Sequence, residues 1–428
     1  MNLRRSATAL GGAAVLCLAG LTAASGALAD GGEPPAALFG DGDPEYDGVW
    51  RQSVALLAQH TAGVVPADEA VTWLAGQSCE HGGFAAYRAG TGADAPCGEE
   101  VLADTNATAV AVQALTALGG HDQAVQTSVD WLKSQQNDDG GWPYLPGDTS
   151  DTNSTALVAG ALAAVGEDPA DTEQGGASPY DALTSLQLGC EAEEQERGAY
   201  AWQPEGDGEL FANDTASVDA VLASYGSGLV VDPDRAGDEP VPAPLNCAES
   251  DGEEPTGAQS AEAGAAYLTG ALERNGGHLT SALAGADDQP DYSGTAKAVL
   301  ALAAGGHREA AAGPLQWLAD HHTEWDGHQD SPAGVGLLVL AAHAGGEDPS
   351  DFGGSDLVST LNALGPAPQT IGDSGEGEAS DEAGDPADSE SSEDSGSTGW
   401  LLWVLVVGVL AGVGAGLLVS MVKRRKTS

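Results

Sequence analysis

The feature that most constrains the fold is an internal repeat in the middle of the chain. Residues 73–84 (Trp-Leu-Ala-Gly-Gln-Ser-Cys-Glu-His-Gly-Gly-Phe) have a counterpart at residues 131–142 (Trp-Leu-Lys-Ser-Gln-Gln-Asn-Asp-Asp-Gly-Gly-Trp). Each is followed by a run that opens with Asp-Thr-Asn, at 104–118 and 151–165. Less regular copies follow at a spacing of about 50 residues, interrupted by an insertion near 226–258. A period of this length indicates a helical repeat protein, in which each unit buries its apolar face against its neighbours.

Each repeat unit predicts a pair of helices. In the first helix Val125, Val129 and Leu132 recur at helical spacing, while Gln126, Asp130 and Lys133 face away. A Gly-Gly pair ends this helix, because glycine adopts the left-handed conformation that a helix stop needs. The second helix opens with an Asp-Thr cap and is apolar or small all round, so it is buried on every side, as at Val110, Ala111, Val112, Ala114 and Leu115. Six helices of each kind predict an all-α fold of two concentric rings.

This pattern resembles the α/α-toroid superfamily over residues 44–365. The superfamily includes the squalene and terpene cyclases, the β subunits of protein prenyltransferases, complement-type thioester domains and the cobalamin carriers of the intrinsic-factor group. Residues 135–142, Gln-Gln-Asn-Asp-Asp-Gly-Gly-Trp, look like the Gln-Trp repeat motif of the cyclases. The resemblance implies an (α/α)6 double-ring toroid with prenyltransferase/squalene-cyclase-like repeats.

The two ends of the chain predict its location in the cell. Residues 1–29 have the charged start, apolar stretch and Ala-Leu-Ala cleavage site of a signal peptide. Residues 400–422 carry no charge and are long enough to cross a membrane, and the basic tail 423–428 places the C-terminus in the cytoplasm. Residues 366–399 are an acidic, Gly- and Ser-rich linker that we expect to be disordered. A sortase signal has a similar arrangement, but its Leu-Pro is missing here. We therefore expect a single-pass protein of the cell membrane with its ectodomain outside.

The charge balance excludes one class of function, and the cysteine content predicts disulfide bonds. The chain has 65 Asp and Glu against 14 Lys and Arg, and this balance excludes a nucleic-acid binder, which needs clustered bases. Four cysteines remain outside the signal peptide, and an extracellular location allows them to pair. Of the three possible connectivities we favour pairing between sequence neighbours, Cys79 with Cys97 and Cys190 with Cys247.

The reactive motifs of the superfamily are missing or altered. The Asp-x-Asp-Asp acid of the triterpene cyclases does not occur. Residues 96–100, Pro-Cys-Gly-Glu-Glu, resemble the thioester motif, but Glu100 replaces the Gln that forms the thioester. His81, His278, His307 and His343 are isolated in the sequence, which favours surface or turn positions over zinc ligands. We therefore predict no catalytic residue, no metal site and no cofactor.

A ligand site is predicted at the end where the second helices of the repeats begin. Their positive dipole ends converge there, and aromatic residues that include Tyr292 and Trp325 follow the first helices. The predicted ligand-binding residues are Tyr87, Asp104, Trp142, Tyr144, Asp151, Trp202 and Asp214. The alternative is that each Asp is a helix cap and each aromatic residue fills a turn, and the sequence leaves both open.

The preferred function is that of a membrane-anchored extracellular binding or adaptor protein. Its partner would be a small ligand or another cell-surface protein. The resemblance to the cobalamin carriers implies a corrinoid-like ligand, although no β-rich segment follows residue 365 to supply the second half of such a site. The alternative is a cyclase- or prenyltransferase-like enzyme with a non-standard active site. A structural role in the cell envelope is a third possibility.

Overall fold

The computed structural model describes residues 35–91, 95–98, 100–235, 241–248, 255–282, 289–325 and 327–370. In these residues the structure consists of twelve α-helices, four short 3-10 turns and two strands of two residues each, which confirms the prediction of an all-α fold. None of the described helices is long and apolar enough to cross a membrane. The predicted signal peptide 1–29, transmembrane helix 400–422 and basic tail 423–428 lie outside the described residues.

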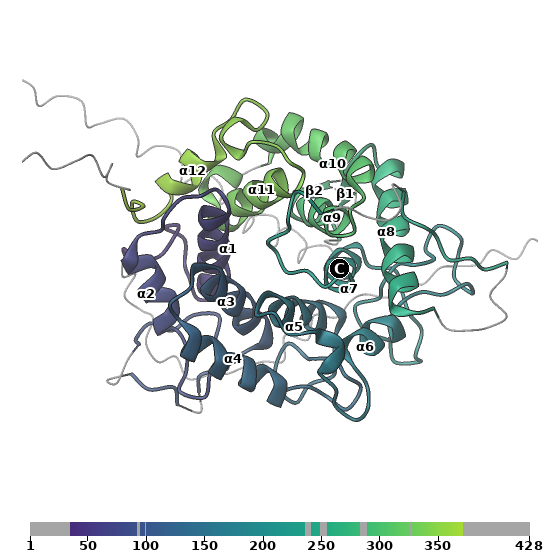
Figure 1. The fold of residues 1–428 in the computed structure, drawn as a ribbon, viewed down its shortest axis with the longest axis horizontal. Helices are drawn as coiled ribbons and strands as arrows, with labels where there is room; N and C mark the ends of the chain where they lie inside the picture. Colours follow the sequence, from purple (N-terminus) through teal and green to yellow (C-terminus); the bar gives the residue numbers. More distant parts are fainter. Residues whose placement is uncertain are drawn as a thin grey trace, which may run out of the picture. The chain divides into compact units, whose positions relative to one another are not determined.

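Six helices, which we call the inner helices, contact one another in sequence. Each contacts the next, and the last contacts the first again (Figure 1). They are α1 (Gly48–Thr61), α3 (Thr105–Leu118), α5 (Thr152–Ala164), α7 (Asp214–Ser224), α9 (Tyr292–Ala304) and α11 (Pro332–Ala344).

The other six helices, which we call the outer helices, alternate with the inner ones along the chain. Each outer helix contacts the inner helix before it and the inner helix after it, and α12 contacts both α11 and α1 (Figure 1). This order agrees with the predicted alternation of two helix types. The outer helices are α2 (Asp68–Gly76), α4 (Asp122–Ser134), α6 (Pro179–Ser185), α8 (Gly257–Arg274), α10 (Arg308–His321) and α12 (Leu357–Ala363).

The composition of each helix type explains where it lies. In α5 every residue from Thr152 to Leu162 except Asn153 is buried, whereas in α4 only Ser128, Val129 and Leu132 are buried. Small residues allow the inner helices to approach closely: a Cβ added at Gly336 of α11 would lie 2.9 Å from Cγ1 of Val54 on α1. Each Leu or Val buried in this way stabilises the fold by about 1.5–3 kcal/mol.

The short elements lie in the connections between helices. Strands β1 (Leu279–Thr280) and β2 (Pro290–Asp291) pair antiparallel just before α9. The 3-10 turns η1 (Pro169–Asp171) and η4 (Pro349–Asp351) follow α5 and α11, and η2 (His322–Glu324) and η3 (His328–Asp330) lie between α10 and α11.

The folded unit extends on both sides of the predicted domain 44–365. Phe39 is fully buried, and its backbone N–H donates to the side chain of Gln52 on α1 at 2.9 Å. At the other end Gln369, in the first residues of the predicted linker, donates from its side chain to the carbonyl of Pro66 at 3.0 Å and to Asp68 at 2.9 Å. The two ends of the described chain therefore both contact the region of α1 and α2.

Both predicted disulfides are present. Cys79 is bonded to Cys97, and Cys190 is bonded to Cys247, which confirms pairing between sequence neighbours. The second bond joins the segment after α6 to the long connection between α7 and α8.

Candidate functional site

Five of the six inner helices, all except α1, begin at side-chain caps that recur from unit to unit. Each cap accepts a hydrogen bond from the backbone N–H three residues later, at 2.7–3.1 Å. Such a cap stabilises a helix by about 1 kcal/mol relative to Ala. The caps of α3, α5, α7, α9 and α11 are Asp104, Asp151, Asn213, Asp291 and Ser331.

A second set of hydrogen bonds ties the aromatic residue of each repeat to the same helix. The backbone N–H of Trp142 donates to the hydroxyl of Thr155 on α5 at 2.9 Å. Phe84 binds Thr108 of α3 at 2.9 Å, and Tyr200 binds Ser217 of α7 at 2.8 Å, in the same way. The pattern Gly-Gly-aromatic followed by Asp-Thr-x-x-Thr is therefore a structural link between a turn and a helix start, and Gly-Ala-Tyr200 followed by Asn213-Asp-Thr-Ala-Ser217 is a variant of it.

Trp142, a predicted ligand-binding residue, lies inside this link. Its side chain is fully buried, and its indole Nε1–H donates to the carbonyl of Leu132 on α4 at 2.6 Å. The structure thus places the ring in the core between α4 and α5, with its polar atom already bonded.

The other predicted aromatic residues are more accessible. Tyr144 and Trp202 are 48% and 52% exposed, and their carbonyls accept the backbone N–H groups of Thr105 and Thr152 at 3.1 and 3.0 Å. The first bond connects the start of α3 to the segment before α5, and the second connects the start of α5 to the segment before α7. The helices α3, α5 and α7 therefore begin on the same side of the unit. Tyr87 is partly exposed and stacks on Trp73 with 6.3 Å between ring centroids.

The predicted carboxylates are committed to local hydrogen bonds. Asp104 and Asp151 are buried caps, and burial raises the pKa of Asp104 to about 7 and raises that of Asp151. Asp214 accepts a hydrogen bond from the hydroxyl of Tyr267 on α8 at 2.6 Å. Burial and this carboxylate together raise the pKa of Tyr267.

A buried ion pair, which sequence reasoning missed, joins the inner helices. Nζ of Lys297 on α9 lies 2.9 Å from Oδ1 of Asp219 on α7, and the other carboxylate oxygen accepts from the side chain of Asn153 on α5 at 2.8 Å. The same ammonium lies 5.7 Å from the ring centroid of Trp50 on α1. One network thus touches four inner helices. In the sequence each partner of the ion pair appears as a single charged residue within an apolar stretch. Lys297 stands in Ala-Lys-Ala-Val, and Asp219 stands in Val-Asp-Ala-Val.

A pocket of about 460 Å³, which we call the α9 pocket, lies beside the starts of α7 and α9. Its walls combine two aromatic rings with carboxylates and hydroxyls, from Thr215, Ser281, Asp291, Tyr292, Glu324 and Trp325. Tyr292 and Trp325 were expected from the sequence to line a mouth at this end, whereas Thr215, Ser281 and Glu324 were not.

The two aromatic rings of the α9 pocket stack on each other. The rings of Tyr292 and Trp325 are nearly parallel, at 5° and 5.3 Å between centroids. Trp317 of α10 lies behind Tyr292 at 5.1 Å and also contacts His278 at 4.5 Å. Tyr292 is buried by these contacts, so the partly exposed ring of Trp325 is the aromatic surface that suits the flat apolar face of a ligand or a cation.

The polar wall of the α9 pocket offers mainly acceptors. Burial raises the pKa of Asp291, while the ammonium of Lys297 lowers it. Glu324 is exposed at the rim. A ligand with hydrogen-bond donors or positive charge would complement these carboxylates. In the part of the chain that the structure describes, no group of three or more His, Cys, Asp or Glu side chains is placed to hold a metal ion.

Comparisons with known proteins add little to this site. No protein-family model matches the chain, and no curated protein matches it. A crystal structure of a protein from Actinoplanes is similar over 69% of this chain and 99% of that chain, with 14% sequence identity and a TM-score of 0.31. At that TM-score the likeness carries no conclusion about fold or function, so the site rests on the geometry above.

Proposed function

We propose that the chain is a cell-surface binding protein built on an α/α-toroid, and that it takes a small organic ligand in the α9 pocket. The toroid is supported by the contact order of the inner helices, because α1 through α11 contact one another in turn and α11 returns to α1. The location outside the cell is supported by the sequence of the two ends and by the disulfides.

The observation that carries the binding proposal is the composition of the α9 pocket. It sets the parallel rings of Tyr292 and Trp325 beside the carboxylates of Asp291 and Glu324 in a space of about 460 Å³. Ligand sites commonly combine aromatic walls with a few convergent polar groups in pockets of about 300–1,000 Å³. The ligand we propose has a flat apolar face and hydrogen-bond donors or a positive charge.

Two earlier candidates fit this pocket less well. A corrinoid is larger than the α9 pocket, so its capture would need further surface, such as the exposed rings of Tyr144 and Trp202. An enzyme would need an acid or nucleophile facing the ligand. Asp104 has the perturbed pKa of a candidate acid, but it does not line the α9 pocket and its carboxylate caps α3.

Fluorescence titration of two tryptophan variants tests the proposal. The protein is titrated with organic cations, small saccharides and cobalamin. For any ligand of the α9 pocket, Trp325→Ala should lower the affinity by about tenfold or more, since a buried aromatic contact contributes up to a few kcal/mol. Trp202→Ala, a matched change at an exposed ring of another unit, should leave the affinity unchanged. If Trp202→Ala loses affinity and Trp325→Ala does not, the ligand binds at Trp202 and the α9 pocket is rejected as the site.

A further inference from the structure

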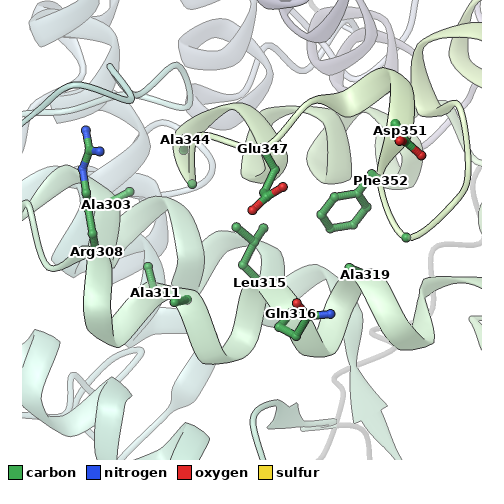
Figure 2. Close-up of a pocket in the computed structure, with 13 residues that line it drawn as sticks. Ala303, Arg308, Ala311, Leu315, Gln316, Ala319, Ala344, Glu347, Asp351 and Phe352 are labelled. Atoms are coloured by element: carbon green, nitrogen blue, oxygen red, sulfur yellow. The ribbon is translucent and has the colours of Figure 1, made fainter.

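A second pocket lies on the outer side of the unit, away from the starts of the inner helices. It has a volume of about 300 Å³ and is lined by α10, the C-terminal end of α11 and the η4 turn. We call it the α10 pocket. Figure 2 shows Leu315 and Ala319 along one side, Glu347 directed into the space beside Phe352, and Arg308 and Asp351 toward opposite ends.

The repeat provides an internal comparison for this pocket. Residues 166–169 after α5 and residues 346–349 after α11 have the same sequence, Gly-Glu-Asp-Pro. The two segments also share their backbone geometry: the N–H of Glu167 donates to the carbonyl of Leu162 at 3.0 Å, and that of Glu347 donates to Ala342 at 2.8 Å. In each the Asp caps a 3-10 turn. Glu167 and Glu347 are therefore equivalent positions.

In the α4–α5 unit a lysine meets this glutamate. Lys133 follows Trp131-Leu132 near the end of α4, and its Nζ lies 2.5 Å from Oε2 of Glu167. The corresponding run in α10 is Trp317-Leu318-Ala319, so an alanine stands where Lys133 would be. In the part of the chain that the structure describes, Glu347 forms no ion pair.

Other differences between the two units change this space in both directions. Gly345 replaces Val165, but Leu315 replaces the smaller Val129, and a Cβ on Gly345 would come 2.2 Å from Cδ2 of Leu315. Phe352 replaces the smaller Thr172, and Ala311 replaces the larger Val125. The open space includes the path of the missing lysine side chain, from Ala319 toward Glu347.

We propose that the α10 pocket binds a primary alkylammonium group, as carried by an aliphatic amine or by a lysine side chain. The alkyl stem would pack on Leu315 and Phe352, and the ammonium would pair with Glu347, as Lys133 pairs with Glu167. Asp351 adds a second carboxylate at the same end. Arg308 lies toward the other end, where its guanidinium is 3.7 Å from Asp234.

The experiment measures binding of n-pentylammonium to the full-length protein by isothermal titration or NMR. A blocked lysine, Nα-acetyl-lysine methylamide, is the second probe, and n-pentanol is the uncharged control. Wild type should bind both ammonium probes and not pentanol. Tighter binding of pentylammonium would identify a free amine as the ligand, and tighter binding of the blocked lysine would identify a protein side chain. Absence of binding by both probes at tens of millimolar would overturn the proposal.

Four substitutions make the test specific, because a chain with 65 acidic residues attracts any cation. Glu347→Gln should weaken ammonium binding by about threefold to fivefold, the effect of an exposed ion pair. Glu309→Gln, which removes a charge from α10 outside the pocket, should not change it. Equal effects of the two changes would show non-specific attraction and reject the site.

Ala319→Lys restores the lysine that the other unit has. It should abolish probe binding and raise the melting temperature, and the rise should vanish in the double variant with Glu347→Gln. A matched Ala319→Met variant fills the same volume without the ammonium, so its melting temperature should not depend on Glu347. If Ala319→Lys binds pentylammonium as wild type does, the α10 pocket is not the site.

Discussion

Asp104 offers a direct test of how the inner helices are held, through the pH dependence of stability. Its carboxylate caps α3 by accepting the N–H of Ala107 at 2.7 Å, and it is 2% exposed. Burial raises its pKa from 3.8 to about 7. In Asp104→Asn an amide oxygen can accept the same hydrogen bond, and the group no longer titrates.

The sign of the effect follows from the raised pKa. The folded state favours the neutral carboxyl group of Asp104. This group therefore adds most to the free energy of unfolding below about pH 4, and the added free energy is lost as the pH rises to about 7. A shift of about three pKa units corresponds to roughly 4 kcal/mol. The free energy of unfolding of Asp104→Asn, minus that of wild type, should therefore increase by up to roughly 4 kcal/mol between pH 4 and pH 7 and then stay constant.

Urea denaturation at half-unit steps from pH 3 to pH 8 measures this difference. Asp356→Asn is the matched control: Asp356 caps α12, but it is exposed, and hydrogen bonds from Ser359 lower its pKa. Asp356→Asn should therefore lower the free energy of unfolding at neutral pH and leave it unchanged at low pH. This pH trend is opposite to the one expected for Asp104→Asn. A flat difference curve for Asp104→Asn, or one that falls with pH, would refute the burial of this carboxylate.

Three further predictions concern the links between repeats. Thr155→Val leaves the buried backbone N–H of Trp142 without its acceptor and should lower the free energy of unfolding by about 1–3 kcal/mol in urea titrations; an unchanged value would mean that this bond is not formed. Lys297→Met leaves Asp219 as an uncompensated buried charge and should cost about 3–5 kcal/mol at neutral pH, measured in the same way. Replacement of both cysteines of the 190–247 disulfide by Ser should cost about 2–5 kcal/mol, and an equal melting temperature with and without the bond would contradict this.

The sequence predicted the helix pairs because two of their signals are local. Asp-Thr caps act within one turn of backbone, and the run of apolar and small residues in α5 can only be buried. The expectation that Gly-Gly ends the first helix was wrong, because α4 ends at Ser134 and Gly140-Gly141 lies in the turn that follows. Disulfide pairing was also predictable, since sequence neighbours among the cysteines proved to be partners.

The side-chain directions were harder to predict. Trp142 occupies the same repeat position as Phe84 and Tyr200, and all three rings are fully buried. Tyr144 and Trp202 occupy a second position, two residues further along, and are 48% and 52% exposed. From the sequence both positions fell in one group, because aromatic residues occur at each. The pair of Lys297 and Asp219 depends on contacts across 78 residues, so the local pattern shows a lone charge in each helix but not that the two charges are partners.

The central claim is that the inner helices close on themselves, and a cross-link across the closure tests it most directly. Gln59 at the end of α1 donates to Oδ1 of Asn362 on α12 at 2.7 Å, across 303 residues of sequence. Cysteines placed at both positions should be joined within one chain by a short bifunctional thiol reagent, giving a looped species on denaturing gels and in mass spectra. Single-cysteine variants should give none. If the double variant reacts at both thiols and yields only unlinked or intermolecular products, then α1 and α12 do not meet and the closed arrangement is wrong.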